Sequence, residues 1–195
     1  MKKIIKILTI IQFSFLFSAN AQSFTGTIHT PNNQVVEGVT ITAKNTSSQA
    51  SITVMSNNDG TFTIDVAEAG DYELSFESDV NPLNGVSTFD LVLISKHILN
   101  ILVQDSYYSI LAMDINGNGI VTVFDIIYLR QFILGIDFIF PVPAWRFLEA
   151  MDDPTDFVPL PEVDTLHFHV DSGETKVLDI IAVKVGDVNG SFIGG

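Results

Sequence analysis

The stretch Val39-Thr40-Ile41-Thr42-Ala43 alternates apolar and hydroxyl-bearing side chains residue by residue. Such a period of two predicts a strand with one face in a core and the other in water. The same alternation recurs at Phe62-Thr63-Ile64 and at Leu74-Ser75-Phe76. Turn clusters separate these segments, and Gly60 stands where a hairpin turn requires a positive φ. We therefore predict a small β-sandwich over residues 22–78.

The first 21 residues have the pattern of a secretory signal peptide. Lys2, Lys3 and Lys6 precede the short apolar run 7–17, and Ala19-Asn20-Ala21 supplies the small residues that a signal peptidase needs. The run is too short to cross a bilayer, which takes about 20 residues. We expect residues 1–21 to be cleaved, no membrane insertion of the mature chain, and a secreted, extracellular or cell-surface location.

Composition excludes several classes of function. The 195 residues include 23 acidic and nine basic side chains and no cysteine. Every acidic residue follows residue 21, so six basic residues face 23 acidic ones in the remainder. Such a surface repels phosphate backbones, which argues against a nucleic-acid partner and in favour of divalent cations. Without thiols there is neither a disulfide framework nor a thiolate metal site.

From Asp79 onward the apolar period becomes helical, and the same pattern occurs twice, 35 residues apart. The offset superposes Asp79 on Asp114 and Asp90 on Asp125. Each acidic loop is followed by an apolar stripe with the three- and four-residue spacing of one helical face. We expect the two stripes to pack on each other; they comprise Leu91, Ile94, Ile98 and Leu99 in the first unit and Ile126, Leu129, Ile133 and Leu134 in the second.

The second loop, residues 114–125, has the layout of a calcium loop. Oxygen-bearing side chains stand at positions 1, 3, 5, 9 and 12, with a glycine at position 6. Hard oxygen donors favour Ca²⁺ over zinc or copper. The alternative is an ordinary Asn-Gly turn that caps a helix. The predicted ligands are Asp114, Asn116, Asn118, the carbonyl of Ile120, Thr122 and Asp125.

The first loop, residues 79–90, keeps the pattern only in part. Leu83 stands at position 5, and the glycine has moved to position 7, where it supplies a carbonyl. One side-chain ligand is therefore lost, and calcium binding by this loop stays open. Its candidate ligands are Asp79, Asn81, Gly85, Ser87 and Asp90.

Two resemblances follow from these motifs. Gly26-Thr27-Ile28, Val36–Ile41, Asp59–Phe62 and Gly70–Leu74 resemble the carboxypeptidase-regulatory-like (transthyretin-like) sandwich module of secreted bacterial proteins. That resemblance implies a module that spaces or presents its neighbours and has no chemistry of its own.

The twin loop-helix units from Asp79 to Gly135 resemble a type I dockerin, the calcium-loaded module that plugs into cohesin domains. The resemblance implies that positions 10 and 11 of each loop read the partner. Phe at position 11 of both loops departs from the small or hydroxylated pairs of cellulosomal dockerins, and core packing of both rings is the alternative. The implied partner-binding residues are Thr88, Phe89, Val123 and Phe124, with Lys96 and Arg130 beside them.

The segments Pro143–Phe147, Asp152–Pro154 and Ile181–Gly190, within residues 137–195, resemble a tail found behind such modules in secreted proteins of gliding-type bacteria. We predict an irregular extension packed on the module 79–136, anchored by Trp145, with one strand at 166–170. Asp187-Val188-Asn189-Gly190-Ser191 restarts the loop pattern without a closing acid, as either a half-site or a turn, and a turn is favoured.

No motif assembles a catalytic site, and His167 and His169 lack a third metal ligand. The predicted fold is mixed: an all-β sandwich followed by an α-helical pair of calcium loop-helix units. The predicted function is a secreted, non-enzymatic calcium-binding module that attaches to a cohesin-like or other secreted protein, in a setting such as polysaccharide degradation. The alternative is a structural spacer or adhesin-type surface protein in which calcium only stabilises the fold.

Overall fold

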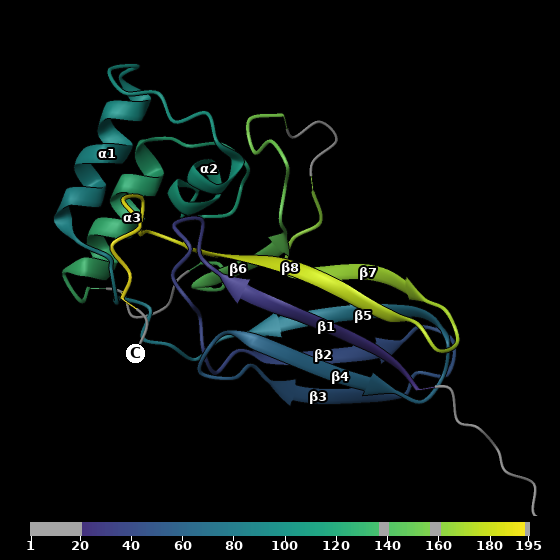
Figure 1. Ribbon diagram of the computed structural model, residues 1–195. Coiled ribbons are helices and arrows are strands. Elements are labelled where there is room, and N and C mark those ends of the chain that lie inside the picture. The colour runs from purple at the N-terminus through teal and green to yellow at the C-terminus, as the bar shows by residue number, and fades with distance from the viewer. Residues whose placement is uncertain (1–20, 137–140, 157–160, 194–195) are drawn as a thin grey trace, which may run out of the picture.

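The computed structural model describes residues 21–136, 141–156 and 161–193, whose strands form two facing sheets (Figure 1). In order, the first sheet contains β4 (Thr61–Val66), β1 (Gln22–His29), β8 (Thr175–Lys184) and β6 (Trp145–Glu149). The second contains β3 (Ser51–Met55), β2 (Thr40–Asn45), β5 (Gly70–Glu77) and β7 (Thr165–Val170). Neighbouring strands are antiparallel, except that β1 and β8 run parallel.

Alternating burial along the strands confirms the predicted sandwich. Ile41 and Ala43 of β2 are buried between the sheets, whereas Thr42 faces outward and its hydroxyl lies 2.9 Å from that of Thr53 in β3. Phe62 and Ile64 of β4 are buried in the same way. The apolar and polar faces read from the sequence are therefore the two faces of the sheets.

Three short helices lie together at one end of the sandwich, between β5 and β6 in the chain (Figure 1). They are α1 (Thr88–Ile98), α2 (Tyr107–Met113) and α3 (Val123–Ile133). The two predicted apolar stripes meet through Ile94 of α1 and Leu129 of α3, which are fully buried in one cluster. The prediction is wrong for the last member of each stripe, because Leu99 and Leu134 lie beyond the ends of the helices and are exposed. None of the helices in the described part of the chain has the length and apolarity that a membrane span requires.

The segment after the helices completes the sandwich, which corrects the prediction of an irregular extension packed on the helical module. β8 lies at the centre of the first sheet and β7 extends the second sheet beyond β5. β8 alternates only in its first half, because both of its faces are covered from Ile180 to Lys184. Leu178 and Ile180 enter the sandwich core, while Ile181 and Val183 pack with Leu111 of α2. The helices are therefore an insertion between strands of one sandwich.

Trp145 also differs from its predicted role. Its side chain is 2% exposed and belongs to the core between the sheets, where it starts β6. The tryptophan thus anchors the C-terminal strands within the sandwich and not against the helices.

Candidate metal centres

Loop 2, which we define as residues 114–125, runs from the end of α2 to the first turn of α3. Asp114 follows the last residue of α2, and Asp125 occupies the third position of α3. Asp114 is 6% exposed and Asp125 is fully buried. The first and last predicted ligands are thus both fixed at helix ends and turned away from solvent.

Backbone amides hold both carboxylates in place. Oδ1 of Asp114 accepts a hydrogen bond from the amide of Asn118 at 3.1 Å, and Oδ2 accepts one from Gly119 at 2.7 Å. Asp125 accepts from the amide of Asn116 at 3.2 Å and from that of Thr122 at 2.7 Å. The loop therefore wraps around Asp114 and is closed by Asp125.

Some of these hydrogen bonds belong to a helix-capping turn, which is the alternative to a calcium loop in the sequence analysis. Thr122 and Asp125 form a capping box on α3, with the Thr122 hydroxyl accepting from the amide of Phe124 at 3.3 Å. Ser87 and Asp90 form the same box on α1. Capping and ion binding are compatible, because a carboxylate has about four lone-pair sites and these amides use only some of them.

The donor set of loop 2 consists mainly of neutral oxygens. Within residues 21–136, 141–156 and 161–193, no three His, Cys, Asp or Glu side chains gather as a metal centre. Loop 2 supplies two carboxylates, and its remaining donors are the amides of Asn116 and Asn118, the Thr122 hydroxyl and the Ile120 carbonyl. Such a set fits Ca²⁺, which accepts carbonyl and amide oxygens, better than a metal that prefers nitrogen or sulfur.

The first predicted loop is not assembled in the same way. Ser87 and Asp90 lie together, with the Ser87 amide donating to Asp90 Oδ2 at 2.8 Å. Asn81 instead accepts from the amide of Leu83 at 2.9 Å through its side chain. Asp79 is exposed and lines a hollow with Glu37 and other residues at the sandwich end. Among the residues that the structure describes, neither Asp79 nor Asn81 forms a hydrogen bond with the closing acid Asp90.

Asp90 is instead bonded to the C-terminal segment. Its Oδ1 accepts from the amide of Val188 at 2.9 Å and from that of Asn189 at 3.2 Å. Asp187 accepts from Ser191 at 2.9 Å and, through Oδ2, from Phe192 at 2.7 Å. The loop pattern restarts at Asp187, where the sequence alone favours a turn over a half-site. The sequence feature that indicates this contact is the match of Asp187-Val188-Asn189-Gly190 to Asp114-Ile115-Asn116-Gly117.

Burial sets the electrostatics of this segment. Desolvation raises the pKa of Asp187, the nearby Asp90 carboxylate raises it further, and hydrogen bonds from Ser191 and Phe192 oppose the shift. Desolvation also lowers the pKa of Lys184 to about 8, although Asp187 acts against that change. The Lys184 ammonium lies 3.2 Å from the Asn81 carbonyl. A buried lysine and a buried aspartate thus lie close in sequence, yet they form no direct ion pair in the described structure.

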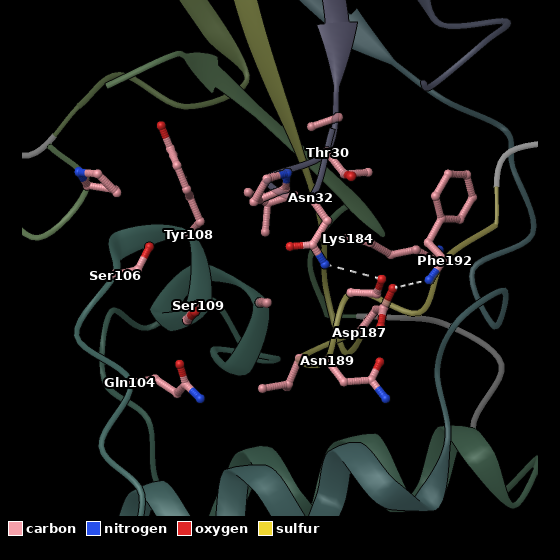
Figure 2. Close-up of a pocket in the computed structure, with 17 residues that line it drawn as sticks. Thr30, Asn32, Gln104, Ser106, Tyr108, Ser109, Lys184, Asp187, Asn189 and Phe192 are labelled. Carbon is pink, nitrogen blue, oxygen red and sulfur yellow. Dashed lines mark hydrogen bonds between the residues drawn. The ribbon is translucent and has the colours of Figure 1, made fainter. Parts of the chain in front are cut away.

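A cleft of about 430 Å³ adjoins this segment, between α2 and the end of β8 (Figure 2). Asp187 and Phe192 stand on one wall, joined by their hydrogen bond, and Asn32 donates from the strand side to the Gly190 carbonyl at 3.3 Å. Tyr108 comes from α2 on the opposite side, and its hydroxyl already accepts from the Met151 amide. The C-terminal segment is therefore held between the sandwich and the helices.

The predicted partner-binding residues lie on the outer surface of the helical insertion. Phe89 is 54% exposed and Phe124 is 61% exposed, so the alternative of core packing is wrong for both rings. Thr88 and Val123 are exposed beside them, at the starts of α1 and α3. Of the two predicted cations, Arg130 is exposed and Lys96 is half-buried.

His167 and His169 do not form a shared metal site. His167 lies 3.0 Å from Glu162, whereas His169 lies 2.7 Å from Asp71. Both imidazoles are more than half exposed. The hydrogen bond with Asp71 is the largest cause of the raised pKa of His169.

Comparison with known proteins supports the sandwich part of this description. Residues 23–92 match the family model of the carboxypeptidase regulatory-like domain, from β1 into α1. A solved structure from Bacteroides uniformis ATCC 8492, described as a candidate carbohydrate binding protein, is 21% identical and has a TM-score of 0.25. That similarity covers 29% of this chain and 29% of that chain. Among curated proteins, none matches.

Proposed function

We propose that this chain is a secreted, non-catalytic calcium-binding module that captures another protein. The helical insertion acts in the manner of a dockerin, and the regulatory-like sandwich carries it. The observation that supports this proposal most directly is loop 2. Oxygen-bearing side chains occupy positions 1, 3, 5, 9 and 12 of this 12-residue loop, as in a calcium loop. Its two acids, Asp114 and Asp125, are both buried.

The charge distribution supports a cation in this place. Asp114 and Asp125 have no Lys, Arg or His nitrogen within 4.0 Å in the described structure. Buried charges in proteins are normally paired or bound to metals. With two acids per site, we expect a dissociation constant of about 10⁻⁵ to 10⁻³ M, in the range of weaker sensor and extracellular sites.

The exposed phenylalanines support protein capture. The 35-residue repeat superposes Phe89 and Val92 of α1 on Phe124 and Ile127 of α3. All four residues are at least 44% exposed. Exposed aromatic side chains at equivalent places are suited to anchoring a partner. A cohesin-like domain or another secreted protein is the proposed partner, and Arg130 offers a positive charge beside the apolar anchors.

Calorimetric titration of the purified chain with Ca²⁺ and Mg²⁺ tests the first half of the proposal. We expect loop 2 of the unmodified chain to bind Ca²⁺. Asp125→Ala should abolish that binding, because the change removes the acid that closes the loop. An unchanged titration after Asp125→Ala, or no heat with either ion, would contradict calcium binding at this loop.

A capture experiment tests the second half and separates it from the spacer alternative. The tagged chain is incubated with the secreted fraction of its source organism in Ca²⁺ and then in EDTA. A dockerin-like module retains a defined protein in Ca²⁺ and releases it in EDTA, and Phe89→Ala with Phe124→Ala prevents its retention. Calcium binding without any retained protein would favour the spacer or adhesin-type function.

A further inference from the structure

We infer that the first calcium site is composite, made from two segments that lie about 100 residues apart in the chain. This inference rests on the proposed calcium function. The C-terminal segment supplies positions 1, 3 and 5, and the residues before α1 supply positions 7, 9 and 12. The ligands are thus Asp187, Asn189, Ser191, the Gly85 carbonyl, Ser87 and Asp90.

The hydrogen bonds around the first ligand are the same in both sites. In loop 2, the position 5 amide donates to Oδ1 of Asp114 at 3.1 Å, and the position 6 amide donates to Oδ2 at 2.7 Å. In the C-terminal segment, the corresponding amides donate to Oδ1 of Asp187 at 2.9 Å and to Oδ2 at 2.7 Å. The turn that wraps the first carboxylate therefore occurs twice.

The closing acids are also equivalent. Asp125 accepts from the position 3 amide of its own loop at 3.2 Å. Asp90 accepts from the position 3 amide of the C-terminal segment at 3.2 Å. Position 4 is a glycine with positive φ in both cases, 69° at Gly117 and 63° at Gly190. The second half of loop 1 is therefore bonded to a first half that comes from the other end of the chain.

Core packing carries the same correspondence independently of the loop hydrogen bonds. Position 2 is apolar in both sites, and position 8 is valine in both. All four side chains join a single cluster with Ile94 and Leu129 of the two helices. These members are Val188 and Ile115 at position 2, and Val86 and Val121 at position 8. In the core, the C-terminal segment thus stands in the same relation to loop 1 as the first half of loop 2 does to its own second half.

The two segments approach so closely that the contact requires a glycine. A Cβ added at Gly85 would lie 2.6 Å from Oδ2 of Asp187 and 2.7 Å from the amide nitrogen of Phe192. The Ser191 hydroxyl donates to the Gly85 carbonyl at 2.8 Å, which joins positions 5 and 7. A continuous loop needs a glycine at position 6 for its sharp turn, whereas a divided loop does not. Phe192 can therefore stand at that position.

The composite arrangement also buries charge without a counter-ion. Asp90 is fully buried and Asp187 is 6% exposed. No Lys, Arg or His nitrogen lies within 4.0 Å of either carboxylate among the residues that the structure describes. A bound cation would supply the missing charge between the two segments.

A comparison of Asp187→Ala with Asp79→Ala tests the inference, because the two residues are the rival candidates for position 1. Calorimetry with Ca²⁺ should show two ions in the full chain and in Asp79→Ala. Asp187→Ala should weaken the binding of one of the two ions by at least about tenfold. Replacing even a residue that only hydrogen-bonds a metal ligand lowers metal affinity by about that factor, and Asp187 is itself the inferred ligand. Ser191→Ala, which removes a single hydroxyl, serves as a milder variant if Asp187→Ala does not fold.

The outcomes separate this inference from the proposed function. Loss of an ion in Asp79→Ala but not in Asp187→Ala would restore the continuous loop and overturn the composite site. A single ion, lost in Asp125→Ala and indifferent to Asp187→Ala and Ser191→Ala, would also overturn it while leaving loop 2 intact. No Ca²⁺ binding by the full chain would remove the proposed function and the inference with it.

Terbium luminescence offers a second measurement that does not depend on counting ions. Trp145 is the only tryptophan of the chain and contacts Phe192, which directly follows Ser191. Tb³⁺ in the composite site should therefore be sensitised through the indole, and Ca²⁺ should displace it. Indole-sensitised emission should persist in Asp125→Ala and disappear in Asp187→Ala. The reverse pattern would assign the nearby ion to loop 2.

Discussion

The indole of Trp145 meets the ring of Phe192 edge-on, with ring centroids 4.8 Å apart and an interplanar angle of 87°. The contact joins the first residue of β6 to the residue that follows the C-terminal turn. Phe192 is 4% exposed and belongs to the sandwich core. The turn at Asp187 is therefore bracketed by β8 on one side and by a core aromatic residue on the other.

Replacing Phe192 should weaken the whole sandwich. Phe192→Ala removes a buried ring, and such changes lower the free energy of unfolding by about 3–5 kcal/mol. Ile193→Ala is the matched control, because its side chain is 75% exposed, and we expect a change within about 0.5 kcal/mol. Urea denaturation of both variants measures the difference. Equal, small effects would show that the end of the chain is not packed as described.

The position of β8 in the centre of a sheet can be tested in the same way. Leu178 is 2% exposed in the sandwich core, and its neighbour Val177 is 77% exposed. Leu178→Ala should lower the free energy of unfolding by about 2–5 kcal/mol, whereas Val177→Ala should have little effect. If the C-terminal segment were an irregular tail, thermal melts would not distinguish the two variants.

The exposed phenylalanines should be dispensable for folding. Phe89→Ala combined with Phe124→Ala should leave the melting temperature close to that of the unmodified chain, because over half of each residue is in water. Leu129→Ala in the helical core is the contrasting variant, with an expected loss of about 2–5 kcal/mol. Circular dichroism melts decide the matter, and an unfolded double variant would return both rings to the core.

The pairing of His169 with Asp71 predicts a specific pH dependence. The pKa of His169 is raised in the folded chain, chiefly by its hydrogen bond with Asp71. The pair therefore stabilises the fold fully below the ordinary histidine pKa of about 6.5, and its contribution is lost as the pH rises through the higher folded value. NMR titration should show a lower His169 pKa in Asp71→Asn, while His167 serves as the internal control. An unchanged His169 titration would contradict the pairing.

The elements that the sequence predicted are those whose pattern is local. Ile41 and Ala43 alternate with threonines and lie in a two-faced strand, and the stripes through Ile94 and Leu129 form the two helices that pack together. β8 could not be recognised in this way, because Ile180 and Ile181 are buried on opposite faces under different layers. A continuous apolar run of that kind has no period to read.

The residues of the candidate sites divide in the same manner. Loop 2 is one continuous segment, so the spacing of its candidate ligands from Asp114 to Asp125 could be predicted from the sequence. The partner of Asp90 is Val188, 98 residues away, and no local spacing specifies such a pair. The only indication in the sequence is that the segment at Asp187 is similar to the segment at Asp114, which begins loop 2.

The parallel pairing of β1 with β8 has a consequence for the order in which the protein folds. Thr27 is in register with Asp179, 152 residues later, so the first sheet has no centre until β8 emerges from the ribosome. Bringing such distant segments together costs about 4 kcal/mol of chain entropy, apart from a constant. Proteins dominated by distant pairings fold slowly. The helical insertion can gather its local contacts early, whereas β1 must wait with an unpaired edge for the final strand.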